Sequence, residues 1–361
     1  MLNDATVATL KSSLRGELIQ PGDAQYDAAR AVYNAMIQRR PRLIARCADV
    51  ADVITAVNFA RTEKMLVSVR GGGHNAAGLG VCDDGLVIDL SPMRWVRVDP
   101  RKRTILAGGG AQWGDVDHAG HAFGLAVPSG IISTTGVGGL TLGGGIGHLT
   151  RQCGLTIDNL LAVDMVLADG RFVTANAKEN ADLFWAVRGG GGNFGVVTAF
   201  LYEAHPIHTN YAGPMLYPLE DTADVLRWYR NFIVKAPKEL NGFFAFLTVP
   251  PGPPFPEHLH LKKMCGMCGA TAGRSRRRRR SSSQFARERR RRSISSGPSR
   301  TRLCRACSTR SIRRGISGTG RPISCVRSTT MRWRCMRSMA ANCRRCCRRC
   351  TCTQSMARRR V

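Results

Sequence analysis

Apolar and polar positions between residues 41 and 205 fall into short blocks that predict strands and helices in alternation. Asp49 is a residue type that favours helix N-termini. Apolar side chains then recur at Val53, Ile54 and Val57, with the three- and four-residue spacing of a helix face. Short apolar runs between turn residues predict strands. By these criteria we expect strands at 43–45, 66–69, 86–90, 95–98, 104–106, 161–167 and 196–203, and helices at 112–123 and 181–187.

The pattern changes beyond Pro206, where glycine becomes less frequent. An amphipathic helix is predicted at 221–234, with strands near 213–217 and 243–249 on either side of it. We interpret the change as a domain boundary. The predicted fold class is α+β, with a helical lead-in (1–40), a glycine-looped domain (41–205), a partial second domain of sheet and helix (206–263) and a tail (264–361).

The basic charge of the chain is confined to the predicted tail. The formal net charge is +29, from 54 Lys and Arg against 25 Asp and Glu. Residues 1–263 hold 25 of these cations and 24 of the anions, whereas 264–361 hold 29 Arg and one Glu. The tail also contains 11 of the 14 cysteines and only eight Leu, Ile, Val and Phe residues, too few to bury a core. We therefore expect the tail to be disordered.

Three interpretations of the tail compete. A basic arm that binds nucleic acid fits the charge and gives the alternative function for the whole chain. A zinc module is suggested by Cys265-x-x-Cys268 and Cys304-x-x-Cys307, although 35 residues separate the two pairs and no His pair accompanies them. A slip of the reading frame near Lys263 explains both the surplus of Arg, Ser and Cys and the loss of Lys, Asp and Tyr. We favour the frame slip.

Cysteine usage and hydropathy favour a reduced, cytoplasmic protein. Cys47, Cys82 and Cys153 are too widely spaced for a disulfide framework. Residues 1–23 lack the apolar segment of a secretory signal, and no stretch approaches the ~18 apolar residues of a membrane-spanning helix. No spacing of His and Cys in residues 1–263 predicts a metal site.

Three glycine-rich segments, at 71–73, 136–147 and 189–195, indicate a phosphate-bearing cofactor. Glycine allows a backbone to approach a ligand closely, and successive N–H groups form a nest that binds anions. Gly71-x-Gly73-x-x-Ala76 fits the Rossmann fingerprint and follows a predicted strand, but another strand comes next in place of a helix. A nicotinamide-dependent Rossmann enzyme is therefore the weaker alternative.

Four motifs occur in the order and spacing of a known family. They are Arg70–Asn75 (RGGGHN), Pro128-Ser-Gly130, the segment from Gly136 to Gly147, and Gly189–Val197 (GGGGNFGVV). As a set they resemble the FAD-binding domain of the berberine-bridge-enzyme-like oxidases, within the vanillyl-alcohol oxidase and p-cresol methylhydroxylase group. The version here is most similar to the bacterial branch that contains 6-hydroxy-D-nicotine oxidase. The resemblance implies a two-part FAD-binding domain of the p-cresol methylhydroxylase type, followed by a truncated antiparallel-sheet substrate domain.

The resemblance also implies roles for individual residues. His74 would carry FAD through a covalent bond from its imidazole to the 8α-methyl carbon of the flavin. The position that supplies a second, cysteinyl bond in some family members is Ile132 here, and we interpret Cys153 as a small buried apolar residue, so the link would be single. The implied cofactor-binding residues are Arg70, Gly71, Gly72, Gly73, His74, Asn75, Gly78, Pro128, Gly130, Thr135, Gly136, Gly139, Gly143, Gly144, Gly147 and, through its backbone, Val197.

The implied activity is an FAD-dependent oxidation of a small organic substrate. Hydride would pass from an activated C–H bond of an alcohol or amine to the flavin, and oxygen would reoxidise it. In the family the catalytic base comes from the substrate domain and a later segment, and this chain has no Tyr or Asp after residue 263. We therefore assign no catalytic residue and expect weak activity or none. The expected partners are the substrate and oxygen, with no specific nucleic acid and no membrane.

Overall fold

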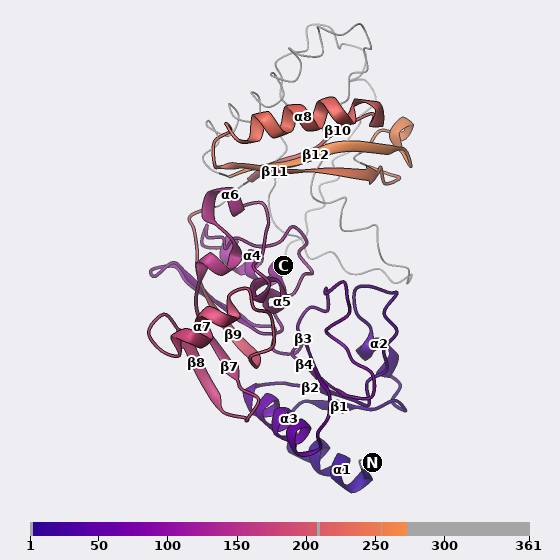
Figure 1. Ribbon diagram of the computed structural model, residues 1–361, viewed down its shortest axis with the longest axis vertical. Coiled ribbons are helices and arrows are strands. Elements are labelled where there is room, and N and C mark those ends of the chain that lie inside the picture. The colour runs from indigo at the N-terminus through magenta and orange to yellow at the C-terminus, as the bar shows by residue number, and fades with distance from the viewer. Residues whose placement is uncertain (1–2, 208–209, 254, 273–361) are drawn as a thin grey trace, which may run out of the picture. The chain divides into compact units, whose positions relative to one another are not determined.

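The structure is a computed structural model that describes residues 3–207, 210–253 and 255–272 of the chain (Figure 1). Most of the predicted tail, residues 273–361, lies outside the described residues, and so do Cys304 and Cys307 of the suggested zinc module. The described residues contain helices and sheets, as the α+β class requires.

A four-stranded sheet begins the fold and carries the first glycine loop. Its strand order is β1-β2-β4-β3; β2, β4 and β3 run parallel, and β1 is antiparallel to β2. Helix α3 (Val50–Thr62) joins β2 to β3, and the Asp49 side chain caps it by accepting hydrogen bonds from the first N–H groups of the helix. The strands are β1 (Glu17–Ile19), β2 (Leu43–Arg46), β3 (Val67–Arg70) and β4 (Leu86–Asp89).

The predicted lead-in is not purely helical. It contains α1 (Asp4–Ser13) and α2 (Tyr26–Arg30), but also β1, which extends the first sheet. The Asp52 carboxylate accepts backbone N–H bonds from Arg15 and Gly16 and so attaches the segment before β1 to α3. A three-residue strand is too short to produce a period-2 pattern, which is why the sequence did not predict it.

A second, five-stranded sheet is antiparallel throughout, with strand order β5-β6-β9-β7-β8. Trp113, Phe200 and Tyr202 are fully buried in the core that it shares with helices α4 (Trp113–His121) and α7 (Ala181–Val187). The predicted order of strands and helices in this region is confirmed, although β8 was not predicted. The strands are β5 (Val96–Asp99), β6 (Thr104–Gly108), β7 (Leu160–Val166), β8 (Phe172–Asn176) and β9 (Val196–Glu203).

One short helix lies within the second glycine segment, and others interrupt the later loops. They are α5 (Val137–Leu142), α6 (Thr150–Cys153) and the 3-10 turns η1 (Thr156–Asn159), η2 (Leu219–Asp221) and η3 (Glu257–Leu259).

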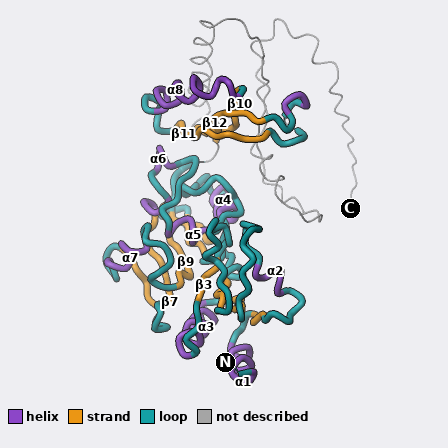
Figure 2. Tube along the Cα trace, turned by 45° about the vertical axis from the view of Figure 1, so that its right-hand side comes forward, coloured by secondary structure: helices purple, strands orange, loops and turns teal. Residues whose placement is uncertain are grey.

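The third sheet has the order β10-β12-β11, and helix α8 (Thr222–Ile233) covers one of its faces (Figures 1 and 2). Its strands are β10 (Asn210–Tyr217), β11 (Leu240–Thr248) and β12 (Lys263–Ala272). The middle strand, β12, pairs with β10 over residues 265–272 and with β11 over residues 263–271. The sheet therefore continues for nine residues, 264–272, into the segment that we had assigned to the tail.

Several polar contacts join β11 and the residues before it to helix α6 and to the loop between α5 and α6. The Arg151 guanidinium donates hydrogen bonds to the carbonyl groups of Ala236, Pro237 and Leu240. The side-chain amide of Asn241 donates to the carbonyl oxygen of Gly147 at 2.5 Å. These bonds place the start of β11 beside the end of the second glycine segment. No helix in the described ranges is both long and apolar enough to cross a membrane.

Candidate flavin site

The first glycine loop leaves the C-terminal end of β3 and is anchored by a buried ion pair. Arg70, the last residue of β3, forms two hydrogen bonds to the Asp89 carboxylate at the end of β4, at 2.5 and 3.2 Å. A third donor of its guanidinium reaches the carbonyl of Ala29. The side chain of Arg70, which the resemblance implies as a cofactor ligand, is thus engaged within the protein and fixes the start of the loop. No helix lies between β3 and β4 in the described chain. A loop connects the two strands directly, as we predicted.

The backbones of the first and second glycine segments are in direct contact at Gly72 and Gly136. A Cβ atom built on Gly72 would lie 2.3 Å from the backbone nitrogen of Gly136, and one built on Gly136 would lie 2.3 Å from that of Gly72. No residue with a side chain fits at either position without moving the backbone. Helix α4 holds the start of the second segment from the other side, because the backbone N–H of Trp113 donates to the Thr135 carbonyl at 3.0 Å.

His74 lies where these two segments come together. Its Nε2 is 3.0 Å from the Thr134 hydroxyl and its Nδ1 is 3.5 Å from the Thr135 hydroxyl. The ring of Tyr33 stacks on the imidazole, with ring centroids 4.1 Å apart and an interplanar angle of 17°. Burial lowers the pKa of His74 from its ordinary value, because desolvation disfavours the charged imidazolium. The site therefore holds a neutral imidazole near pH 7.

Gly139 provides a test of whether the residues fit a bound cofactor. It lies inside helix α5, its φ is not positive, and an added Cβ would meet nothing within 4 Å. A glycine inside a helix costs about 1 kcal/mol relative to alanine. Neither packing nor backbone conformation requires glycine here, whereas close approach of a ligand to the helix would require it. The position fits a cofactor that lies against this turn.

The end of the second glycine segment returns to the Pro128 loop. A Cβ built on Gly147 would overlap the Ser129 carbonyl oxygen, at 1.5 Å, and one on Gly130 would contact the Leu140 side chain at 2.5 Å. Pro128, Gly130, Gly143, Gly144 and Gly147 therefore belong to one group of loops around α5. In the first loop, Asn75 closes a turn by accepting the Leu79 N–H, and Gly78 has a φ of +73°.

Val197 lies in strand β9, and the third glycine segment directly precedes that strand. The Val197 side chain is buried in the core of the five-stranded sheet, so only its backbone can contact a ligand. The segment 189–195 lies between α7 and β9, which is the reverse of the Rossmann order, and the Gly191 N–H donates to the Leu142 carbonyl at the end of α5.

Cys153 ends helix α6 and packs against Leu149, Ile207 and Ala272. Burial raises the pKa of its thiol, so the thiol stays protonated. Cys153 is only partly buried, whereas we expected a buried residue, but its side chain packs among apolar neighbours. Ile132, at the family's second attachment position, is partly buried.

Two residues of the site were not predicted. Thr134 adjoins the predicted Thr135, and its hydroxyl makes the shorter contact to His74. Tyr33 lies in the N-terminal lead-in, far from the glycine motifs in sequence, and no pattern in the sequence connects it with His74.

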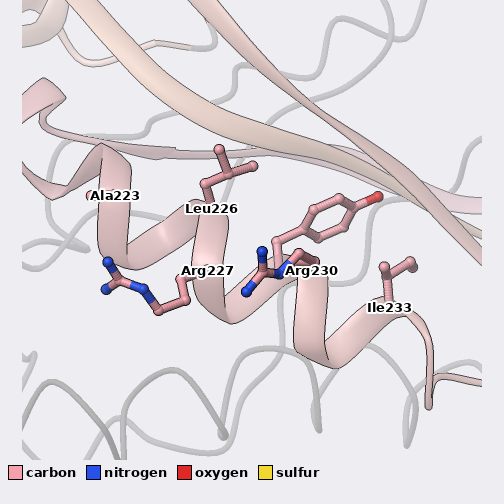
Figure 3. A pocket seen from close by; sticks show the side chains of 6 residues that line it. Ala223, Leu226, Arg227, Arg230 and Ile233 are labelled. Atoms are coloured by element: carbon pink, nitrogen blue, oxygen red, sulfur yellow. The ribbon is translucent and has the colours of Figure 1, made fainter.

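Other clusters in the described chain carry no comparable chemistry. A pocket of about 480 Å³ is lined by six residues of α8, among them Leu226, Arg227 and Arg230, and by none of the predicted site residues (Figure 3). Cys265 and Cys268 both lie in the regular strand β12; residues three apart in a strand point to opposite faces, so these two thiols do not form one side of a zinc site. No group of three His, Cys, Asp or Glu side chains within the described ranges could hold a metal ion.

Comparison with known proteins identifies the cofactor. Residues 41–176 match the family model described as an FAD binding domain. (R)-6-hydroxynicotine oxidase of Paenarthrobacter nicotinovorans is 41% identical over 194 residues, which are 53% of this chain and 42% of that protein. The predicted resemblance and the prediction of FAD are thereby confirmed.

Solved structures agree with this assignment. 6-Hydroxy-D-nicotine oxidase from Arthrobacter nicotinovorans superimposes with a TM-score of 0.68 at 31% identity, covering 75% of this chain and 58% of that one. A berberine-bridge-enzyme-like protein of Physcomitrella patens gives a TM-score of 0.64 at 28% identity, covering 75% of this chain and 57% of that one. The chain spans about half the length of the curated relatives that it matches.

Proposed function

Because residues 41–176 match the family model of an FAD binding domain, we propose that the chain is an FAD-linked oxidoreductase that oxidises a small organic molecule with oxygen as the second substrate. The bond oxidised would be an activated C–H next to an alcohol or amine. The bound FAD would supply the redox chemistry, with the substrate as hydride donor and oxygen as the final electron acceptor. The polypeptide would orient the substrate and the cofactor and set the electrostatics of the site.

The first and second glycine segments would hold the cofactor through their backbone N–H groups. Successive N–H groups of residues 71–73 and of the segment after Gly136 suit a diphosphate, since such nests carry a concentrated positive potential. Arg70 contributes indirectly, because its ion pair with Asp89 fixes the loop from which these groups project. The single observation that carries the proposal is the helical Gly139 with free space at its Cβ, next to the Gly72–Gly136 contact.

His74 would hold the flavin covalently and alone. Its imidazole is neutral, so a ring nitrogen has a lone pair available for bond formation, and the glycine loop places this ring beside the proposed diphosphate-binding segments. Cys153 has a thiol whose pKa is raised, which makes it a poor nucleophile. No catalytic base is assigned.

Flavin fluorescence of the full chain after denaturing electrophoresis tests this assignment. We expect a fluorescent protein band for the wild type and for Cys153→Ala, and no band for His74→Ala, because only the imidazole makes the bond. A band that persists in His74→Ala, or one that disappears in Cys153→Ala, contradicts the proposed attachment.

A further inference from the structure

The segment around Tyr33 clamps the first glycine loop on both sides of His74. Tyr33 N–H donates to the carbonyl of Gly73 at 3.0 Å, immediately before the histidine. The Asn34 side-chain amide donates to the carbonyl of Ala76 at 2.9 Å, two residues after it. Between these two bonds the Tyr33 ring lies nearly parallel to the imidazole. No residue of the proposed cofactor-binding set performs this function.

The Tyr33 ring is not needed to fill a core. Half of the residue, 50%, is exposed to solvent, and it belongs to none of the buried hydrophobic clusters of the described chain. Its contact in the site is the stack on His74. A large aromatic side chain kept half-exposed against a single imidazole points to a role in orienting that imidazole.

We propose that Tyr33 is a positioning residue for the covalent attachment of FAD to His74. The inference rests on the proposed function, since it assumes that His74 makes the bond. The stack fixes the plane of the imidazole, and the Thr134 and Thr135 hydroxyls fix its rotation within that plane. With both set, the nitrogen that forms the bond is held in one orientation while the cofactor is bound.

The attachment step is an oxidation and has a defined balance. A bond forms between an imidazole nitrogen of His74 and the 8α-methyl carbon of the flavin. One C–H bond of that methyl group and the imidazole N–H bond break. The two protons and two electrons released reduce dioxygen, the second substrate, to hydrogen peroxide. Tyr33 takes no part in these bonds and acts only through the position of His74.

Desolvation of the His74 ring also favours its neutral form, and we expect the stacked Tyr33 ring to contribute to that desolvation. The His74 imidazole stacks on the Tyr33 ring, and its two ring nitrogens contact the hydroxyls of Thr134 and Thr135. Desolvation lowers the pKa of His74, so removal of the ring should raise that pKa toward about 6.5. A bond-forming nitrogen would then be protonated for a larger fraction of the time at mildly acidic pH.

The test follows covalent flavin formation with time. Full-length apoprotein from riboflavin-starved cells is mixed with FAD and air, samples are unfolded in acid, and the flavin that stays with the polypeptide is measured. Tyr33→Ala should slow attachment at least about tenfold, as expected for a misoriented reacting group. Tyr33→Phe, which keeps the ring, should react at the wild-type rate. Phe172→Ala, which removes a similarly exposed ring (47%) from β8, is the matched control and should also match the wild type.

Two further readouts separate positioning from general damage. Reversible FAD binding, measured before attachment, should change less than the attachment rate in Tyr33→Ala. Titration of the His74 ring protons by NMR in the apoprotein should show a higher pKa in Tyr33→Ala than in the wild type.

The outcomes distinguish this inference from the proposed function. Attachment by Tyr33→Ala within twofold of the wild-type rate overturns the role of Tyr33 and leaves the His74 link intact. Equal loss in Tyr33→Phe overturns the ring stack as its cause. If the wild type itself forms no covalent flavin, the proposed function is wrong at His74.

Discussion

Two glycines at the start of α5 are present for different physical reasons. Gly136 is required by the fold, because its backbone touches that of Gly72 and a side chain would collide there. Gly139 is not required by the fold, since its helical backbone and free surroundings would accept alanine. Replacement of a glycine that the fold requires should destabilise the apoprotein. Replacement of a glycine that only the ligand requires should weaken ligand binding without that loss of stability.

Replacement by alanine therefore separates the two roles. Gly139→Ala should leave the free energy of unfolding of the apoprotein unchanged or raise it by up to about 1 kcal/mol, because alanine is the better helix residue. The same change should weaken FAD binding at least about tenfold, since a methyl group occupies the space beside the cofactor. Gly136→Ala should impair both properties. The measurements are chemical denaturation and fluorescence titration with FAD.

Gly22→Ala is the control, since a Cβ there also meets nothing within 4 Å and the residue lies outside the proposed site. Wild-type FAD affinity in Gly139→Ala would show that the cofactor does not lie against α5.

At this scale the sequence predicted the motif residues but not all their roles. His74 and the glycines stand in recognisable order, whereas the Arg70–Asp89 pair and the Tyr33 stack join positions that only the fold brings together. The family resemblance implied that Arg70 belongs to the site, but only the fold shows that its side chain pairs with Asp89.

Strands β3 and β4 are paired in the first sheet. Arg70 and Asp89, the last residues of the two strands, form an ion pair at the start of the first glycine loop. Asp89 is fully buried, at 0% exposure, and accepts hydrogen bonds from Arg70 and from both the backbone N–H and the hydroxyl of Ser91. A buried pair of this kind contributes little net stability, but removal of one partner leaves the other charge without compensation.

Asp89→Ala should consequently lower the free energy of unfolding by about 3–5 kcal/mol. We also expect weaker FAD binding, because the start of the first loop loses its anchor. Chemical denaturation of the apoprotein measures the first effect. Asp224→Ala removes a carboxylate from the pair with Arg227, in which both side chains are exposed, and should leave the denaturation midpoint nearly unchanged. Equal midpoints for Asp89→Ala and the wild type would contradict a structural role for the buried pair.

The elements that the sequence predicted well are those with a strong apolar pattern. Helix α3 and strands β4 and β9 bury most of one face or both faces, and their residues show it. Strand β8 buries only Ala175, β1 has three residues, and α5 has six residues, of which Gly138 and Gly139 are poor helix formers. Such elements depend on their neighbours for stability, so the local sequence carries little signal for them.

For the whole chain, the division of charge remains the main feature of the sequence. The 263 residues before the predicted boundary are nearly neutral, and the arginines that give the chain its net charge of +29 follow them. Strand β12 places the end of the regular fold at Ala272 or beyond, because the middle strand of a sheet cannot be removed without loss of both ladders. The frame slip near Lys263 and the nucleic-acid-binding arm stay predictions, and most of the tail to which they apply, residues 273–361, lies outside the described ranges.

The identity of the cofactor and its point of attachment can be tested in one measurement on the full chain. The protein is incubated with FAD in air, unfolded in acid and analysed by intact-mass spectrometry, with peptide mapping to locate any adduct. We predict the mass of the polypeptide plus one FAD less two hydrogen atoms, with the adduct on the peptide that contains His74. The mass of the bare polypeptide alone, or an adduct on a peptide without His74, would contradict the account.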